Sequence, residues 1–413
     1  MKTDKVVRNT SAAGSIRRLG IAAATIFLLL SPITGRSETT TLMFSVSARG
    51  EFNDNIFYNA SENTDELITT LSPSLTYRRM SERLDISLKG SLAHRFYQNE
   101  NDLGETDQTY GSSFNYVATE RLTIGGNAGY TIDSRRDRDI ETTGIVLNNV
   151  VRERQSAGTG VQYLLSENNT VGLNLSFGED TFDDSEYNDF EMQHIDAWFS
   201  RRLTLDTTMQ VNLGNDHYSY PQVEVDNYSL TAGAGTRLSE FLTLSAYIGG
   251  RYTLSRYEIT HPILYWITSR YETDETSMVG QVGVSYSGEF TQWELGFQHD
   301  IQAASGRSGT SQRTGTTCSI TRRLTENVSL LASASFFSNR ADGSDYGTGE
   351  IDERTIMFRP VIRWRINDRF SVDAAYRYLK EKENINDIER DGNVFWVRLT
   401  YRTDLLELLN PQP

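Results

Sequence analysis

The stretch FSVSARGEF, residues 44–52, decides the fold class because its side chains divide between two faces. Phenylalanine, valine, alanine and glycine occupy every second position, and serine, arginine and glutamate occupy the positions between them. A two-residue period is typical of a β-strand, in which successive side chains point to opposite faces of a sheet. The apolar face of such a strand contacts either a second sheet or membrane lipid, and the remaining sequence distinguishes these two cases.

The same alternation recurs along the chain, and the connections between alternating segments are alternately short and long. Tight turns are predicted at residues 79–82, 119–121, 166–169, 200–202, 238–241, 287–290, 322–327 and 366–368. Long connections are predicted near residues 53–66, 98–106, 134–151, 178–188, 215–226, 255–275, 302–312, 339–352 and 379–391. This rhythm predicts about 18 antiparallel strands, with about 16 as the alternative. Short turns on one side and long loops on the other are typical of a Gram-negative outer-membrane barrel with both termini in the periplasm.

Two further patterns favour lipid over a second sheet as the partner of the apolar face. The last outward-facing residue of many predicted strands is aromatic. At the ends next to long loops these residues are Phe52, Phe96, Tyr130, Phe177, Tyr252 and Phe336, and at the ends next to short turns they are Tyr77, Tyr116, Tyr163, Tyr286, Trp364 and Tyr401. Such rings typically form girdles at the two membrane interfaces. Charges recur on the other face, where burial between sheets would be costly. We therefore predict an all-β, transmembrane, up-and-down antiparallel barrel; a secreted β-sandwich array or β-solenoid is the alternative.

The N-terminal segment and the overall charge narrow the class of protein further. Residues 1–37 combine basic side chains, an apolar run at 19–30 and small residues near position 37, which predicts a secretory signal peptide rather than a retained anchor. Residues 38–413 are predicted to form one barrel domain with a short C-terminal tail at 402–413. The net charge of −15 argues against nucleic acid as a partner. The lone Cys318 excludes an internal disulfide.

The end of the first predicted strand carries a family resemblance. Asp54-Asn55-Ile56-Phe57 is followed by LSPSLTY at residues 71–77, which contains Pro73. This pattern resembles the opening of the β-barrel porin type 2 family of Gram-negative outer-membrane proteins, many of which are associated with exopolysaccharide gene clusters, including exosortase-linked ones. The resemblance implies export of a polysaccharide together with periplasmic export components. An alternative interpretation of Asp54-Asn55 is a turn pair that tolerates left-handed backbone geometry.

The candidate pore-lining residues are the basic residues at the alternate strand positions that are predicted to face the lumen. They are Arg49, Arg78, Lys89, Arg95, Arg251, Arg359, Arg363, Arg365, Arg377 and Arg398. Three of them share one strand near the C-terminus and two come from the next two strands, which predicts a positive stripe on one wall of the lumen. Guanidinium groups pair well with carboxylates and phosphates, so an acidic sugar polymer is a suitable guest. The alternative is that acidic residues, among them Asp373 and Glu353, neutralise the stripe.

Two long connections and one dipeptide also attract attention. The apolar loop at residues 261–271 is predicted to constrict the pore through Ile263, Leu264, Tyr265 and Trp266, or else to extend its hairpin and pack on a neighbour. The loop at residues 342–353 has Asp342 and Glu353 at the first and last positions of an EF-hand-like spacing, but its middle positions favour an acidic surface loop over a Ca²⁺ site. The pair Asp216-His217 resembles a protease dyad, yet adjacent strand residues point to opposite faces.

The sequence thus predicts a passive, polar-lined outer-membrane channel with no catalytic centre and no cofactor. Its expected surroundings are outer-membrane lipid and lipopolysaccharide, and its expected folding partner is the barrel-assembly machinery. Export of an anionic exopolysaccharide is the function that the resemblance implies. A nutrient-uptake or general diffusion porin is the first alternative, and a non-conducting structural or adhesive barrel is the second.

Overall fold

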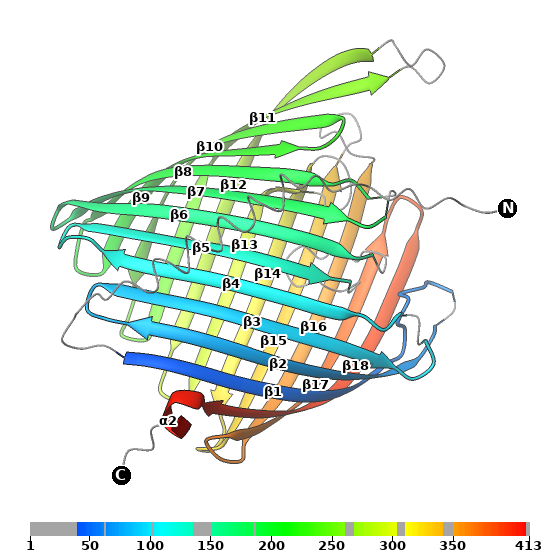
Figure 1. Cartoon of the computed structure of the whole chain (residues 1–413). Coiled ribbons are helices and arrows are strands. Elements are labelled where there is room, and N and C mark those ends of the chain that lie inside the picture. Colours follow the sequence, from blue (N-terminus) through cyan, green and yellow to red (C-terminus); the bar gives the residue numbers. More distant parts are fainter. Residues whose placement is uncertain are drawn as a thin grey trace, which may run out of the picture.

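A computed structural model describes residues 39–61, 63–100, 103–134, 150–184, 187–260, 268–303, 310–341 and 350–409 of the chain. These residues form one antiparallel sheet of 18 strands. The sheet closes on itself, because β1 (Thr39–Asn53) pairs with β2 (Glu66–Met80) on one side and with β18 (Ile388–Asp404) on the other (Figure 1). The predicted closed barrel and its strand number are therefore confirmed. The predicted signal peptide lies outside the described residues.

The strands between these three follow one another around the barrel, each paired with its neighbours in the chain. They are β3 (Leu84–Tyr97), β4 (Thr106–Val117), β5 (Leu122–Asp133), β6 (Arg152–Ser166), β7 (Asn169–Phe182), β8 (Phe190–Arg202), β9 (Thr207–Ser219), β10 (Val223–Arg237), β11 (Leu242–Thr260), β12 (Thr268–Ser287), β13 (Thr291–Ala303), β14 (Thr310–Arg323), β15 (Val328–Ala341), β16 (Ile351–Arg365) and β17 (Phe370–Glu383). A short helix, α2 (Leu405–Leu409), follows β18. The predicted tail from residue 402 is wrong in this respect, since β18 continues to Asp404, which accepts the backbone N–H of Leu42 on β1 (3.2 Å).

The end of the barrel that holds the eight short turns, the start of β1 and the end of β18 is called the turn end here. Five of its turns share one hydrogen-bonding pattern, shown by residues 324–327. The backbone N–H groups of Leu324 and Thr325 donate to the Val328 carbonyl, and the Thr325 hydroxyl accepts from the N–H groups of Asn327 and Val328 (3.3 and 3.0 Å). The same bonds recur with Thr119, Thr204, Ser239 and Asn367. A side chain that bonds its own backbone in this way stabilises a tight turn locally. The turn predicted at 200–202 lies at 203–206, because β8 continues to Arg202.

The opposite end is called the loop end. Three connections predicted to be long are largely strand there: residues 220–222 join β9 to β10, residues 384–387 join β17 to β18, and the β11–β12 hairpin continues to the pair Thr260–Thr268. This hairpin projects beyond β13, which pairs with β12 only from Gly280 onward (Figure 1). The outward-facing residues of these segments are polar, so their composition resembles a loop although their backbone groups pair in the sheet ladder.

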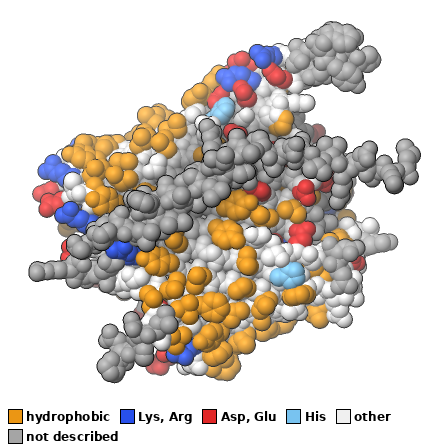
Figure 2. Space-filling view, in the orientation of Figure 1, with side chains coloured by type: hydrophobic (Ala, Val, Ile, Leu, Met, Phe, Trp, Pro, Cys, Tyr) orange, Lys and Arg blue, Asp and Glu red, His pale blue; other side chains and the backbone are white. Residues whose placement is uncertain are grey.

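The two faces of the sheet differ as the alternation predicts. Large apolar side chains are exposed on the outside, for example Leu213, Ile248 and Trp364 at 50–60 %. Figure 2 shows them as a broad apolar surface, with charged side chains gathered towards the ends of the barrel. An exposed apolar surface of this extent, present on all described strands except β5, fits a lipid surrounding and not water.

The inward face changes character along the barrel axis. On β16 the inward residues Glu353 and Thr355 near the loop end are buried, Arg359 is half-buried, and Arg363 and Arg365 near the turn end are exposed. The inward residues of β14 follow the same gradient, from buried at Ser311 and Arg313 to exposed at Ser319 and Thr321. The lumen is therefore packed in its loop-end half and open in its turn-end half.

Candidate functional site

The turn-end half of the lumen carries a wall of arginines on β16, β17, β18 and β1, and these strands are neighbours because the barrel closes between β18 and β1. Asp373 on β17 is the carboxylate within this wall. Its Oδ1 accepts from Arg363 Nε (2.8 Å), and its Oδ2 accepts from Arg398 Nη2 (2.5 Å). The Asp373 side chain is only 4 % exposed, whereas those of Arg363 and Arg398 are 47 % and 36 % exposed. One buried acid thus orients two basic groups that still face the lumen.

Arg49 adds a residue from the first strand to this wall. It lies directly opposite Arg398 in the β1–β18 register, and both guanidinium carbons lie over the Trp396 ring, at 5.0 and 5.3 Å from its centroid. Arg49 also forms an ion pair with Glu51. Cation–π contact of this kind helps to hold both guanidinium groups in place against one ring.

A hollow of about 400 Å³ lies against this wall. Its lining includes Arg49, Arg359, Arg363, Arg377 and Arg398 together with Trp396, and no carboxylate is among the described residues that line it. Serine and threonine side chains of β14 and β15 line its other part. The sequence left open whether acids neutralise the stripe. The structure brings Asp373 to Arg363 and Arg398 and Glu51 to Arg49, so acids pair with at least three of these arginines. Glu353 lies instead in the packed loop-end half.

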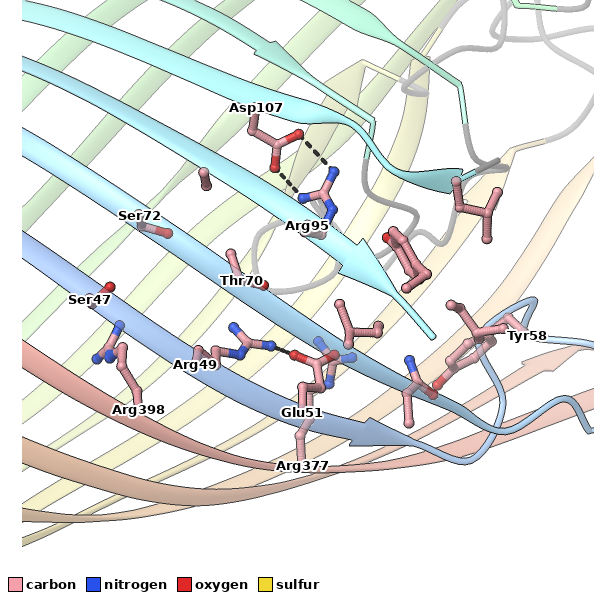
Figure 3. A pocket seen from close by; sticks show the side chains of 16 residues that line it. Ser47, Arg49, Glu51, Tyr58, Thr70, Ser72, Arg95, Asp107, Arg377 and Arg398 are labelled. Atoms are coloured by element: carbon pink, nitrogen blue, oxygen red, sulfur yellow. Dashed lines mark hydrogen bonds and ion pairs between the residues drawn. The ribbon is translucent and has the colours of Figure 1, made fainter. Parts of the chain in front are cut away.

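A second hollow, of about 190 Å³, lies at mid-height under the β1–β2 connection and shares three arginines with the first. Figure 3 shows Arg49, Arg377 and Arg398 on one side of it and the ion pair of Arg95 with Asp107 on the other. Arg95 also donates to the Ser134 hydroxyl (2.7 Å). This hollow marks the level at which the open half of the lumen gives way to the packed half.

The remaining predicted pore-lining residues lie apart from this wall. Arg78 pairs with Asp85 at the turn end, with Arg78 Nη2 at 2.6 Å from Asp85 Oδ2. Arg251 is buried in the loop-end half of β11, where it donates to Asp300 (3.0 Å) and to the Ser277 hydroxyl (2.5 Å). Lys89 and Arg365 line a further hollow at the turn end. The structure therefore separates the predicted set into a wall, a turn-end group and two buried arginines, Arg95 and Arg251, that lie outside both.

The motif that carries the family resemblance has a structural role at the barrel seam. Asp54 accepts from both the backbone N–H and the side-chain amide of Asn393 on β18 (2.6 and 2.7 Å). The fully buried Asn55 donates to the carbonyls of Asp391 and Asn59 (both 2.9 Å). Neither residue has a left-handed backbone; that conformation occurs at Tyr58, with φ of 53°. The left-handed geometry of the turn-pair interpretation is therefore wrong, although Asn55 does begin a turn, since its carbonyl accepts from the Tyr58 N–H (3.2 Å). The two side chains also join the first strand to the last.

The segment after this motif folds into the lumen. Ile56 lines the hollow of Figure 3, and Tyr58 packs against Met357 and Leu379, which face inward from β16 and β17. Leu379 is 1 % exposed. A second buried cluster at the loop end contains Phe190, whose ring stacks on Tyr220 at 5.3 Å, and burial raises the pKa of the Tyr220 hydroxyl. Neither cluster was predicted from the sequence. The signal that could have found them is the presence of aromatic residues at inward positions, where the barrel pattern otherwise places polar ones.

Other predicted sites are not assembled among the described residues. Ile263, Leu264, Tyr265 and Trp266 lie outside the described residues, as does Asp342; Glu353 is a strand residue facing the lumen rather than the end of a loop. Asp216 contacts His194 Nδ1 (2.6 Å), while His217 contacts Asp226 (2.8 Å) on the opposite face, so the dyad is absent as expected. Among the described residues we find no group of ligands suited to a metal ion and no helix able to span a membrane.

Comparisons with known proteins add a similarity of shape. No family model matches the sequence, and no curated protein matches it either, so the resemblance to the porin type 2 family stays a prediction. The structure is similar to OpdL of Pseudomonas aeruginosa, with a TM-score of 0.44 and 9 % identity over 89 % of this chain and 99 % of that one. For OccAB1 of Acinetobacter baumannii the TM-score is 0.46 and the sequence identity is 10 %, over 91 % of this chain and 99 % of that one. For OpdK of P. aeruginosa, solved with vanillate, the TM-score is 0.44 and the sequence identity is 10 %, over 88 % of this chain and 98 % of that one. At these scores the similarity carries no functional information.

Proposed function

We propose that this protein is a passive outer-membrane channel that exports an anionic exopolysaccharide through its arginine-lined lumen. The observation that carries the proposal is the wall hollow, which is lined by five arginines and one tryptophan and has no carboxylate in its described lining. Arginine binds carboxylates and phosphates in a bidentate manner, and aromatic rings add contact with sugar rings. A protein with an overall charge of −15 has no general reason to gather arginines here.

The apolar outer surface supports a membrane location, and the closed sheet supports it further, since a barrel leaves no unpaired strand edge in lipid. The turn end would face the periplasm, because short turns occur on that side of outer-membrane barrels. The first residue of β1 and the last residue of β18 also lie at this end. Lipopolysaccharide would then surround the loop end, and the barrel-assembly machinery and periplasmic export components would be the protein partners.

The test is single-channel conductance of the refolded protein in a planar bilayer, with a uronic-acid oligosaccharide and a neutral maltooligosaccharide as probes. We expect steady conductance that the acidic sugar blocks and the neutral sugar does not. Replacing Arg359, Arg363 and Arg377 with serine should lower the anion preference several-fold, because it removes three positive charges from the wall. The matched control replaces Arg354, Lys380 and Lys382 with serine, since these are outward-facing cations of the same two strands, β16 and β17.

Unchanged anion preference in the wall variant would contradict a role for the arginines. Absence of conductance would contradict the channel itself. Deletion of the gene in the source bacterium separates export from uptake: an exporter's loss abolishes surface polysaccharide, whereas an uptake porin's loss slows growth on a small solute.

A further inference from the structure

The turn-end mouth of the lumen contains a third hollow, of about 450 Å³, that differs from the wall hollow above it. Six cationic residues line it: Lys89, Arg363, Arg365, Arg369, Arg398 and Arg402. The carboxylates that line it are Asp368 and Asp373, and Asp373 is already engaged by Arg363 and Arg398. Within the described part of the chain, no carboxylate forms an ion pair with Lys89, Arg369 or Arg402. The mouth therefore carries an excess of positive charge that faces solvent.

The rest of this lining is rich in hydroxyl groups. Ser45 and Ser47 from β1, Ser72 and Ser74 from β2, and Ser91 from β3 contribute to it, with Ser371 and Thr400 from the other side of the seam. The Ser45 and Ser74 hydroxyls lie 3.2 Å apart. Small hydroxyl side chains leave room for a ligand and offer both donors and acceptors. Cations beside hydroxyls fit a carboxylated sugar, which presents carboxylate and hydroxyl groups on each unit.

The three hollows form a continuous cationic path up one side of the lumen. The mouth hollow shares Arg363 and Arg398 with the wall hollow, and the wall hollow shares Arg49, Arg377 and Arg398 with the mid-height hollow of Figure 3. Along β16 the path from Arg365 to Arg359 covers six residues, which is about 20 Å of extended strand. A chain with regularly spaced carboxylates could contact several of these cations at once.

The opposite end of the lumen has no equivalent mouth among the described residues. The inward arginines near this end are held by neighbouring side chains: Arg152 and Arg154 by Asp180, Arg251 by Asp300, Arg390 by Glu381, and Arg313 by Asn339 (2.9 Å). Internally bonded guanidinium groups are poor initial contacts for a ligand arriving from solvent, because the ligand must first displace their partners.

We propose that the turn-end hollow is the loading site of the channel, where a uronic-acid glycan first binds before it moves along the arginine wall. This inference rests on the proposed function and adds to it the site where the glycan first binds. The glycan carboxylates pair with Arg365, Arg369 and Arg402, and its hydroxyl groups bond the serines of β1 and β2. Binding from the turn end precedes contact with the wall.

The experiment measures sidedness of block with the full-length mature protein inserted in one orientation in a planar bilayer. The probes are hexagalacturonate and, as the neutral control, maltohexaose, each added to one side at a time. We expect hexagalacturonate to block from the turn side at a concentration about tenfold lower than from the loop side. The double variant R365Q/R402Q should raise the blocking concentration on the turn side by about tenfold and leave the loop side unchanged.

The matched control is R201Q/R322Q, which removes two arginines from the turn end on the outward face of β8 and β14. Hexagalacturonate should block this control variant at the same concentrations as it blocks the unmodified protein. Equal block from both sides of the unmodified protein would overturn the loading site while leaving an anion channel intact. Absence of block from either side would instead contradict the proposed function. Because the sidedness is measured on the unmodified protein, the test does not depend on the variants folding.

Discussion

Along the inward face of β16, Glu353 and Thr355 are buried at one end, whereas Arg363 and Arg365 are exposed at the other. The two halves of the lumen are built on the same strands with the same alternation, yet one half is a packed core and the other a solvated, cationic vestibule. The difference arises from what enters the barrel: the segment around Tyr58 fills part of the loop-end half, and nothing among the described residues fills the turn-end half. Packing should therefore control stability at the loop end, and charge should control selectivity at the turn end.

Replacing an aromatic residue with alanine in each half is the strongest test of this contrast. Phe190→Ala removes a buried ring from the loop-end cluster and should lower the free energy of unfolding by about 3–5 kcal/mol. Trp396→Ala removes a ring from the arginine wall and should cost about 1 kcal/mol, mainly through lost cation–π contact, while it changes anion selectivity. Urea unfolding in detergent micelles measures both changes. Equal losses of stability would mean that the two halves are packed alike.

Asp373→Asn tests the charge balance of the turn-end half. The change weakens two charge-assisted hydrogen bonds, so we expect the free energy of unfolding to fall by about 1.5–3 kcal/mol. It also removes a negative charge that two arginines share, so the anion-to-cation permeability ratio, measured from reversal potentials, should rise. Glu240→Gln is the matched control, because Glu240 is an exposed residue of the β10–β11 turn that lines none of the three hollows. A permeability ratio that falls in Asp373→Asn would show that the arginines need this partner to face the lumen.

Asn55→Ala tests the seam at the loop end. It leaves the carbonyls of Asp391 and Asn59 without their side-chain donor and should cost about 1–3 kcal/mol. Because Asn55 holds the segment that carries Tyr58 into the lumen, we also expect conductance to rise. Asn63→Ala is the control in the same connection, since Asn63 is exposed. If conductance stays constant while stability falls, the segment around Tyr58 does not narrow the path.

Thr325→Ala gives the smallest effect, because it touches one turn and neither half of the lumen. Loss of the hydroxyl that accepts two backbone N–H groups should cost about 0.5–1.5 kcal/mol with selectivity unchanged. Thr325→Asn should restore most of the stability, since Asn367 makes the same bonds in the β16–β17 turn. A loss in the alanine variant that asparagine does not restore would contradict the shared turn pattern.

The strands, their two faces and most of the tight turns could be predicted from the sequence because each depends on residues close together in the chain. Alternation assigns a side chain to a face within a few residues, and Thr325 or Asn367 bonds only its own turn. Predictions of connection length were less accurate at residues 215–226 and 379–391. There, the outward-facing residues are polar instead of apolar, so the alternation that marks a strand is lost although the backbone still pairs with the neighbouring strand.

Local sequence determined that this chain forms alternating strands with an apolar outer face and arginines on the inner one. Only the tertiary structure decided which arginines meet. Arg49 lies beside Arg398, and Asp54 bonds Asn393, because closure of the barrel pairs the first strand with the last. The division of the lumen into a packed half and an open half was decided in the same way, since Tyr58 reaches Met357 and Leu379 only when the barrel is closed. Contacts across such sequence distances depend on the whole sheet, and no local pattern encodes them.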